Sequence, residues 1–178
     1  MRSEPTIVVW DTCVIIDAIQ KTPGRYECIE PYVKDAEKGR LRIIISEVCV
    51  AELLMLKQYD AQGMPIEEQV RLIREWLENP YIVRRAVYPR IAERAAEVGR
   101  DNEISPATDA IVVATALCEP VQILHTFDGL DEGAATRTRN KLCTYDGMIG
   151  TPPLHIGPPD QSHGTIFAKS KPTGRTPS

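Results

Sequence analysis

Short apolar runs, several of them ending at a polar or acidic residue, alternate with amphipathic segments along most of this chain. The first run covers residues 6–10, and Asp11 follows it directly. An uninterrupted apolar run of this length is typical of a strand buried on both faces, as in a parallel sheet covered by helices. Similar runs predict further strands at residues 41–45, 81–87, 121–126 and 154–156.

Helical periodicity fills the intervals between these strands. Apolar residues recur at spacings of three and four, and turn residues such as Gly39 close the segments. The pattern predicts helices at residues 14–20, 26–38, 47–59, 67–78, 89–100 and 106–118. Pro31 offers an alternative start for the second helix. Ser46 and Ser105 stand where the third and sixth helices need an N-cap.

Strands that alternate with helices indicate a three-layer α/β/α fold with a mostly parallel central sheet. The composition changes near residue 150, because six of the 14 prolines lie in the last 28 residues and Phe167 is the only aromatic residue there. We therefore expect one α/β domain over residues 1–156, followed by a proline-rich, flexible tail over residues 157–178.

The composition narrows the class of protein. Hydrophobic residues make up 43% of the chain, which is typical of a globular protein, and no apolar run approaches the ~20 residues that cross a membrane. The chain enters its first strand at once, so a secretory signal is not expected. The five cysteines form no CxxC pair, which favours reduced thiols in the cytoplasm. A net charge of −4 argues against a duplex-DNA reader that uses broad electrostatics.

Four acidic residues interrupt or end apolar segments. Asp11 and Asp128 follow the first and fourth predicted strands, at the edge where open α/β sheets place their ligands. Glu52 has apolar neighbours at helical spacing, and Asp109 stands in the first turns of an apolar helix. A carboxylate on the core side of a helix is unfavourable unless it is paired or bound to a metal.

Each acid alone also has an ordinary explanation. Asp11 or Asp128 could form a cap or a turn, and Glu52 could pair with an arginine. Asp109 could stabilise only its own helix N-terminus. Together, however, carboxylates gathered at one edge would repel each other and require a cation. Ligands that are all oxygen suit Mg²⁺ or Mn²⁺ better than zinc.

Four segments resemble, in order, the motifs of the PIN-domain ribonucleases. They are residues 9–17, 46–53, 109–116 and 124–128. The resemblance implies a Mg²⁺- or Mn²⁺-dependent endoribonuclease whose metal-binding acids are Asp11, Glu52, Asp109 and Asp128. Asp131 is an alternative to Asp128 as the fourth acid. Thr126 matches the small hydroxyl residue before the family's last acid and would orient substrate or water.

The same resemblance implies partners. Many relatives are VapC-type toxins, which an antitoxin holds inactive and which are often homodimers, so an RNA substrate, an antitoxin and a second copy are expected. Cys13 departs from the family pattern, in which asparagine or serine is commoner at that position. The basic residues that could contact RNA phosphates are Arg84, Arg85, Arg90, Arg94, Arg137, Arg139 and Lys141.

Two other readings of the acids stay open from the sequence. A Rossmann-like phosphatase would carry an Asp-x-Asp-x-Thr motif after its first strand, whereas here Asp11 is followed by Thr12 and Cys13. A non-catalytic scaffold that binds RNA or protein would not need the full set of four acids.

Overall fold

The computed structural model describes residues 4–55, 65–129 and 141–159. Within these ranges five parallel strands form one sheet in the order β3-β2-β1-β4-β5. Along that order the strands are Ile82–Arg85 (β3), Leu41–Ser46 (β2), Thr6–Trp10 (β1), Ile123–His125 (β4) and His155–Gly157 (β5). The expected sheet of mostly parallel strands is therefore confirmed.

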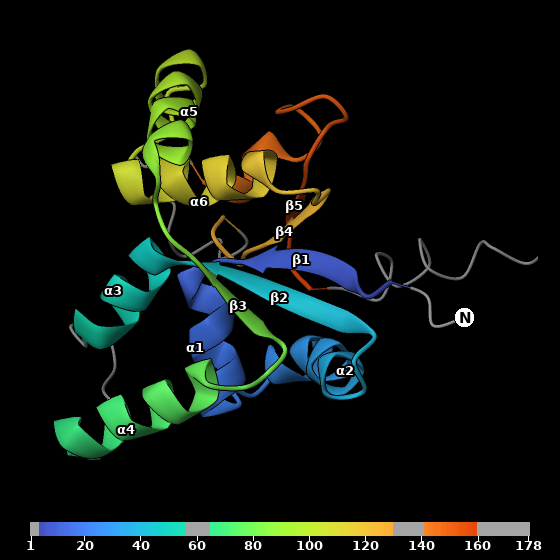
Figure 1. The fold of residues 1–178 in the computed structure, drawn as a ribbon, viewed down its shortest axis with the longest axis vertical. Coiled ribbons are helices and arrows are strands. Elements are labelled where there is room, and N and C mark those ends of the chain that lie inside the picture. Colours follow the sequence, from blue (N-terminus) through green and yellow to red (C-terminus); the bar gives the residue numbers. More distant parts are fainter. Residues whose placement is uncertain (1–3, 56–64, 130–140, 160–178) are drawn as a thin grey trace, which may run out of the picture.

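Helices cover both faces of this sheet, which confirms the three-layer arrangement. Helices α1, α2 and α4 lie on one side, and α5 and α6 lie on the other (Figure 1). The helices are Thr12–Gln20 (α1), Tyr26–Glu37 (α2), Glu47–Met55 (α3), Ile66–Leu77 (α4), Pro89–Asp101 (α5) and Ala107–Cys118 (α6). None of these helices is long and apolar enough to span a membrane, within the ranges that the structure describes.

The sheet order reverses at β1, which has β2 on one side and β4 on the other. In the β1–β4 pair, Val9 is aligned with Leu124 and Trp10 with His125. The backbone N–H of Asp11 continues this ladder by donating to the carbonyl of His125 at 3.0 Å. The residues that follow β1 and β4 therefore leave the sheet side by side, at the point where such folds bind ligands.

The carboxyl-terminal part of β1 is fully buried, because Val8, Val9 and Trp10 have no exposed surface. The Trp10 indole Nε1 donates to Nδ1 of the buried His125 at 3.0 Å, and the Trp10 ring stacks on Trp76 with centroids 6.2 Å apart. Trp10 thus belongs to the core. Its hydrogen bond to His125 also gives an indole N–H buried in the core a partner.

The first helix begins earlier than predicted, whereas the second begins at the predicted residue. Helix α1 starts at Thr12 rather than at residue 14, because Asp11 is its N-cap. Helix α2 starts at Tyr26 and contains Pro31, so the alternative start at residue 31 is wrong. Pro31 is exposed. The carbonyl that its missing N–H would have bonded therefore lies on the solvent side of α2.

Neither expected serine cap forms. Ser46 is the last residue of β2, aligned with Arg85 of β3, and its buried hydroxyl has no hydrogen-bond partner among the described residues. Pro106 occupies the N-cap position of α6 and makes no side-chain cap bond, so Ser105 lies one residue outside the helix. Helix α3 is described as far as Met55, and its expected continuation to residue 59 lies outside the described residues.

The expected start of the tail needs a correction, because Gly157 is part of β5. Gly157 is buried and aligned with His125, and its carbonyl accepts from the N–H of Thr126 at 2.9 Å. Pro159 is also buried, and residues 160–178 lie outside the described residues. The domain therefore includes Gly157 and Pro159, beyond the expected boundary at residue 156.

Two truncations test this boundary. Removing residues 160–178 should leave the melting temperature almost unchanged. Removing residues 157–178 leaves the N–H of Thr126 without its partner, which should cost roughly 1–3 kcal/mol of unfolding free energy. Thermal melts of the two truncated proteins and of the full chain make the comparison. An equal loss of stability in both would show that the last 19 residues pack on the domain.

Candidate metal centre

Asp11 is held by three donors at the carboxyl end of β1. Its Oδ1 accepts from the backbone N–H of Thr12 at 2.7 Å, while Oδ2 accepts from the Thr126 hydroxyl at 2.8 Å and contacts the Cys13 thiol at 3.4 Å. Burial raises the pKa of Asp11 above its usual value, although these donors favour its ionised form. The side chain is therefore fixed in orientation and would be stabilised further by a nearby cation.

Glu52 reaches the same place from α3. The Thr12 hydroxyl donates to Glu52 Oε2 at 2.6 Å, so Thr12 joins the two acids through its backbone N–H and its side chain. The negative charge of Glu52 is close enough to add to the raised pKa of Asp11. Glu52 thus has a hydroxyl partner beside Asp11.

Asp109 lies in the first turn of α6. Its pKa is raised to about 7, first by burial and then by repulsion from Asp11, Asp128 and Glu52. A weak contact from the Thr108 hydroxyl at 3.4 Å opposes this shift. Because the other three acids act on Asp109, the fold brings all four sequence-predicted acids into one negatively charged cluster.

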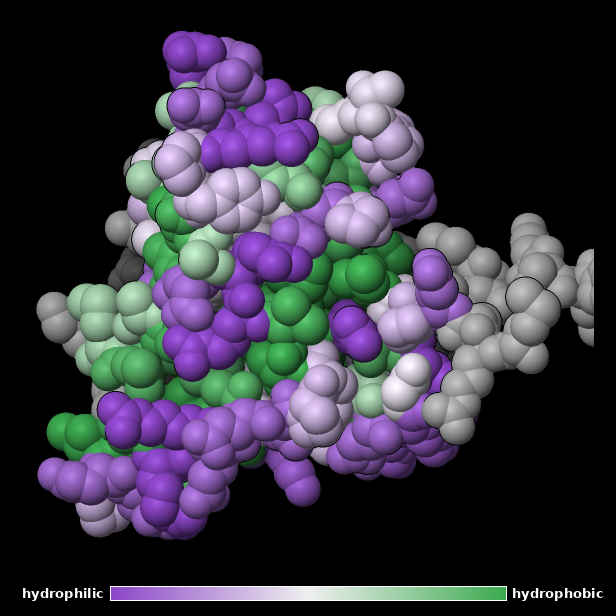
Figure 2. All heavy atoms as spheres, viewed as in Figure 1, coloured by the Kyte–Doolittle hydropathy of each residue, from purple (hydrophilic) through white to green (hydrophobic). Residues whose placement is uncertain are grey.

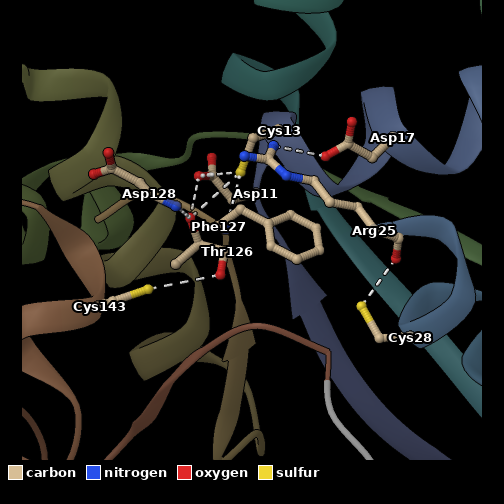
Figure 3. Close-up of polar contacts among 9 residues, drawn as sticks. All are labelled: Asp11, Cys13, Asp17, Arg25, Cys28, Thr126, Phe127, Asp128 and Cys143. Carbon is tan, nitrogen blue, oxygen red and sulfur yellow. Dashed lines mark hydrogen bonds and ion pairs between the residues drawn. The ribbon is translucent and has the colours of Figure 1, made fainter. Parts of the chain in front are cut away.

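Asp128 is placed differently from the other three. It is exposed, and its Oδ2 accepts from the backbone N–H of Leu142 at 2.9 Å, at the start of the 3₁₀ helix Leu142–Tyr145 (η2). Figure 3 shows its carboxylate pointing away from Asp11. Gly129 follows with a φ of +104°, and a Cβ there would lie 2.7 Å from the Lys141 Cβ. Asp131, the alternative fourth acid, lies outside the described residues.

Thr126 lies at the centre of the hydrogen bonds around Asp11. This fully buried hydroxyl donates to Asp11 Oδ2, accepts from the Asp128 N–H at 3.0 Å and lies 3.4 Å from the Cys13 sulfur. Its backbone N–H is bound to Gly157, so β5 fixes its position. Thr126 therefore sets the orientation of Asp11 and the start of the turn that carries Asp128.

Three cysteines border the acids, and the sequence pattern had singled out only Cys13 among them, as a departure from the family motif. The Cys13 sulfur accepts from the Phe127 N–H at 3.3 Å, and the Cys143 thiol donates to the Thr126 carbonyl at 3.7 Å. Burial raises the pKa of Cys13 well above its usual value and that of Cys143 to about 11. Burial and the charge of Asp11 also raise the pKa of Cys49. These thiols are protonated and inert near neutral pH.

The chemistry of this cluster fits a hard divalent cation. Four carboxylates and a hydroxyl offer oxygen ligands, and their mutual repulsion would be relieved by positive charge. In the part of the chain that the structure describes, no three His, Cys, Asp or Glu side chains are arranged as a closed set of metal ligands. Asp128, whose carboxylate accepts from the Leu142 N–H at the start of η2, is one acid that is engaged elsewhere.

Comparison with known proteins decides the family. The PIN domain family model matches residues 8–129, which is more than half of the chain. The chain belongs to the PIN domain family. The resemblance seen in its motifs is thus confirmed, and no curated protein matches the chain significantly.

Solved structures share the fold of this PIN domain at low sequence identity. VapC20 of Mycobacterium tuberculosis, a toxin that cleaves the sarcin-ricin loop, has a TM-score of 0.53 at 15% identity over 75% of this chain and 98% of its own. DNA-bound VapBC of Salmonella typhimurium has a TM-score of 0.54 at 16% identity, over 85% and 96%. VapBC2 of Rickettsia felis, bound to a promoter DNA fragment, has a TM-score of 0.51 at 19% identity, over 68% and 87%.

Several basic residues named as candidates for RNA contact are engaged with acids of the PIN domain itself. Arg84 binds Glu47 at 2.8 Å, and Arg85 binds Glu119 at 2.6 Å. Arg94 similarly binds Glu97, one turn along α5. Arg137 and Arg139 lie outside the described residues.

Proposed function

We propose that this PIN-domain protein is a Mg²⁺- or Mn²⁺-dependent endoribonuclease, in which Asp11, Glu52, Asp109 and Asp128 hold the ion. One observation carries the proposal: the family match over residues 8–129 includes all four acids. Asp131 is the alternative to Asp128. A divalent cation bound there would lower the pKa of a water molecule and stabilise charge that develops on the phosphate.

The protein's own residues would prepare this site before RNA arrives. Thr126 and Thr12 fix the Asp11 carboxylate, and Thr12 also orients Glu52. Asp109, with a pKa of about 7, would release its proton more readily once a cation offsets the charge of its neighbours. Hydrogen bonds that orient metal-binding carboxylates in this way contribute to both metal affinity and catalysis.

Cleavage of RNA by the purified protein tests this proposal. We expect a structured RNA with single-stranded loops to be cut in Mn²⁺ or Mg²⁺ and to stay intact in EDTA, with the new ends located by primer extension. Asp101→Asn is the control for substitutions of the four site acids, because Asp101 is an exposed acid at the end of α5 that pairs with Arg100. Equal RNA decay in EDTA and in Mn²⁺ would contradict the proposal. So would decay that elutes with a contaminant rather than with this protein during chromatography.

We further infer that the protein acts in the cytoplasm as the toxin of a toxin-antitoxin pair and forms a homodimer. Structures of VapBC complexes share its fold, and Figure 2 shows apolar surface on the side of α3 and α4. Met55 of α3 and Ile66 of α4 are 61% and 63% exposed. Such surface is typical of a protein that has a partner.

Growth of cells that express the protein tests the toxin role. We expect growth arrest that depends on Asp11 and that is relieved when the protein encoded by the adjacent gene is expressed with it. Light scattering of the purified protein gives its mass in solution. Normal growth at high expression, together with a monomeric mass, would count against both inferences.

A further inference from the structure

A partly buried ion pair lies beside the acidic cluster and is not explained by metal binding. Arg25 NH1 donates to Asp17 Oδ2 at 3.0 Å, and the Asp17 side chain is only 8% exposed whereas that of Arg25 is 32% exposed. We propose that Arg25 binds a phosphate of the RNA backbone next to the acids. This inference rests on the proposed ribonuclease function and adds the residue that receives the negatively charged substrate.

Contacts from three segments place the Arg25 guanidinium near the cluster. Asp17 lies four residues after Cys13 on α1, hence one turn along the same face of that helix. The guanidinium also lies over the Phe127 ring, 4.8 Å from its centroid, and the Phe127 N–H is bound to the Cys13 sulfur. Figure 3 shows the side chain extending from its loop toward Cys13 and Asp11.

The negative charge of the site explains why a positively charged side chain would help RNA to bind there. RNA carries a negative phosphate at every nucleotide, and the cluster that would cleave it is built from carboxylates. A bound divalent ion offsets part of this repulsion, but the phosphates on either side of the cleaved bond still need positive partners. Arg25 places a guanidinium at the edge of the cluster, where Asp17 offsets part of its charge, and a guanidinium matches the geometry of a phosphate well.

Arg25 is also held in one orientation before any ligand binds. Asp17 fixes one end of the guanidinium, and the Phe127 ring supports one face. The Arg25 carbonyl accepts from the Cys28 thiol at 2.9 Å, which fixes the backbone of the loop. A long side chain normally loses rotamer freedom when it binds a ligand. Because Arg25 is already held in one orientation, little of this entropy is lost on binding. A partly exposed guanidinium anchored on two sides is therefore well suited to a fixed phosphate position.

The competing explanation is that Arg25 only ties α1 to the turn that carries Thr126 and Asp128. The dependence of RNA binding on salt separates the two roles, because each phosphate contact on a single strand contributes about −0.7 to the slope of log K against log salt. Binding of a fluorescein-labelled, single-stranded oligoribonucleotide of mixed sequence is measured by anisotropy in EDTA. The assay measures binding without cleavage, so it can be interpreted even if the protein proves not to be a nuclease.

Five variants complete the design. Arg25→Met removes the charge, and Arg25→Lys keeps it. Arg40→Met is the matched control, because Arg40 is an exposed arginine that pairs with Asp35 just before β2, at the opposite end of the sheet. If Arg25→Met does not fold, Asp17→Asn is compared with the double variant Asp17→Asn/Arg25→Met, in which neither partner is left buried and charged.

The expected result is that Arg25→Met weakens RNA binding roughly tenfold, the scale of one charge-assisted hydrogen bond. It should also make the salt slope shallower by about 0.7. Arg25→Lys should keep the slope, and Arg40→Met should change neither quantity. Asp17→Asn should lower stability while RNA binding stays equal or becomes tighter. The proposal would be overturned if Arg25→Met had the same salt slope as the wild type, or if the double variant had the same slope as Asp17→Asn. Arg25 would then have only a structural role.

Discussion

Asp109→Asn should abolish most Mn²⁺-dependent RNA cleavage while leaving the metal-free protein as stable as the wild type or more stable. Asparagine keeps the size of the side chain but cannot be ionised. If Asp109 is a metal ligand, the remaining acids no longer hold the ion in position, and the variant should also lose most of the thermal stabilisation that Mn²⁺ gives to the wild type. Melts in EDTA and in Mn²⁺, with cleavage assays of both proteins, measure these effects.

The gain in metal-free stability follows from the position of Asp109 among other acids. Burial and the charges of Asp11, Asp128 and Glu52 raise its pKa to about 7. At neutral pH the ionised form is therefore opposed by its surroundings. Removing that charge should stabilise the fold by on the order of 1 kcal/mol, because the partial exposure of Asp109 weakens the repulsion.

The same shift predicts how stability depends on pH. The folded protein holds the Asp109 proton up to about pH 7, whereas the unfolded chain releases it near the usual value of 3.8. Between these values the folded state binds more protons, so the stability of the metal-free wild type falls as pH rises. The Asp109→Asn variant lacks this contribution. The two proteins should melt alike near pH 4 and diverge in favour of the variant by pH 7.

Asp101→Asn again serves as the control, since this exposed acid should change neither cleavage nor the response to Mn²⁺. A structural role for Asp109, such as stabilising only the start of α6, makes the opposite prediction. In that case Asp109→Asn would melt below the wild type in EDTA, and its gain in melting temperature on addition of Mn²⁺ would be unchanged.

Much of the fold could be predicted from the sequence because its strands are continuous apolar runs. The runs before Asp11 and Asp128 gave the two strands at the switch point of the sheet, and helical spacing placed Glu52 and Asp109 on α3 and α6. The helix starts were less predictable. Ser46 has the right residue type for a cap, but the ladder between β2 and β3 takes it into the sheet first.

The surroundings of the acids were the part that the sequence pattern could not show. The contacts of Thr126 with Asp11, and of Arg25 with Phe127, join residues more than 100 positions apart. Periodicity reports which residues face the core, but not which distant side chains meet there. The cysteine at position 13 was visible as a departure from the family motif, yet its contact with the carboxylate of Asp11 required the fold.

Thr126→Val should weaken both the metal site and the fold, whereas Thr126→Ser should weaken neither strongly. Valine has nearly the shape of threonine but no hydroxyl. It would remove the donor to Asp11 Oδ2 and the acceptor of the Asp128 N–H in a fully buried position. An unsatisfied buried group costs roughly 1–3 kcal/mol, and each kcal/mol lowers the melting temperature of a protein of this size by about 2–4 °C.

The effect on the metal site should be larger than the effect on stability. Loss of an outer hydrogen bond that orients a metal ligand typically reduces metal affinity about 10–100-fold, and cleavage at limiting Mn²⁺ should fall with it. Titration calorimetry with Mn²⁺ gives the affinity without relying on activity. Serine keeps the hydroxyl, so it should restore affinity even if the lost methyl group leaves a small packing defect. If the Thr126→Val and Thr126→Ser variants bind Mn²⁺ equally well, Thr126 does not orient Asp11 for metal binding. Its hydroxyl then serves only to hold the turn that leads to Asp128.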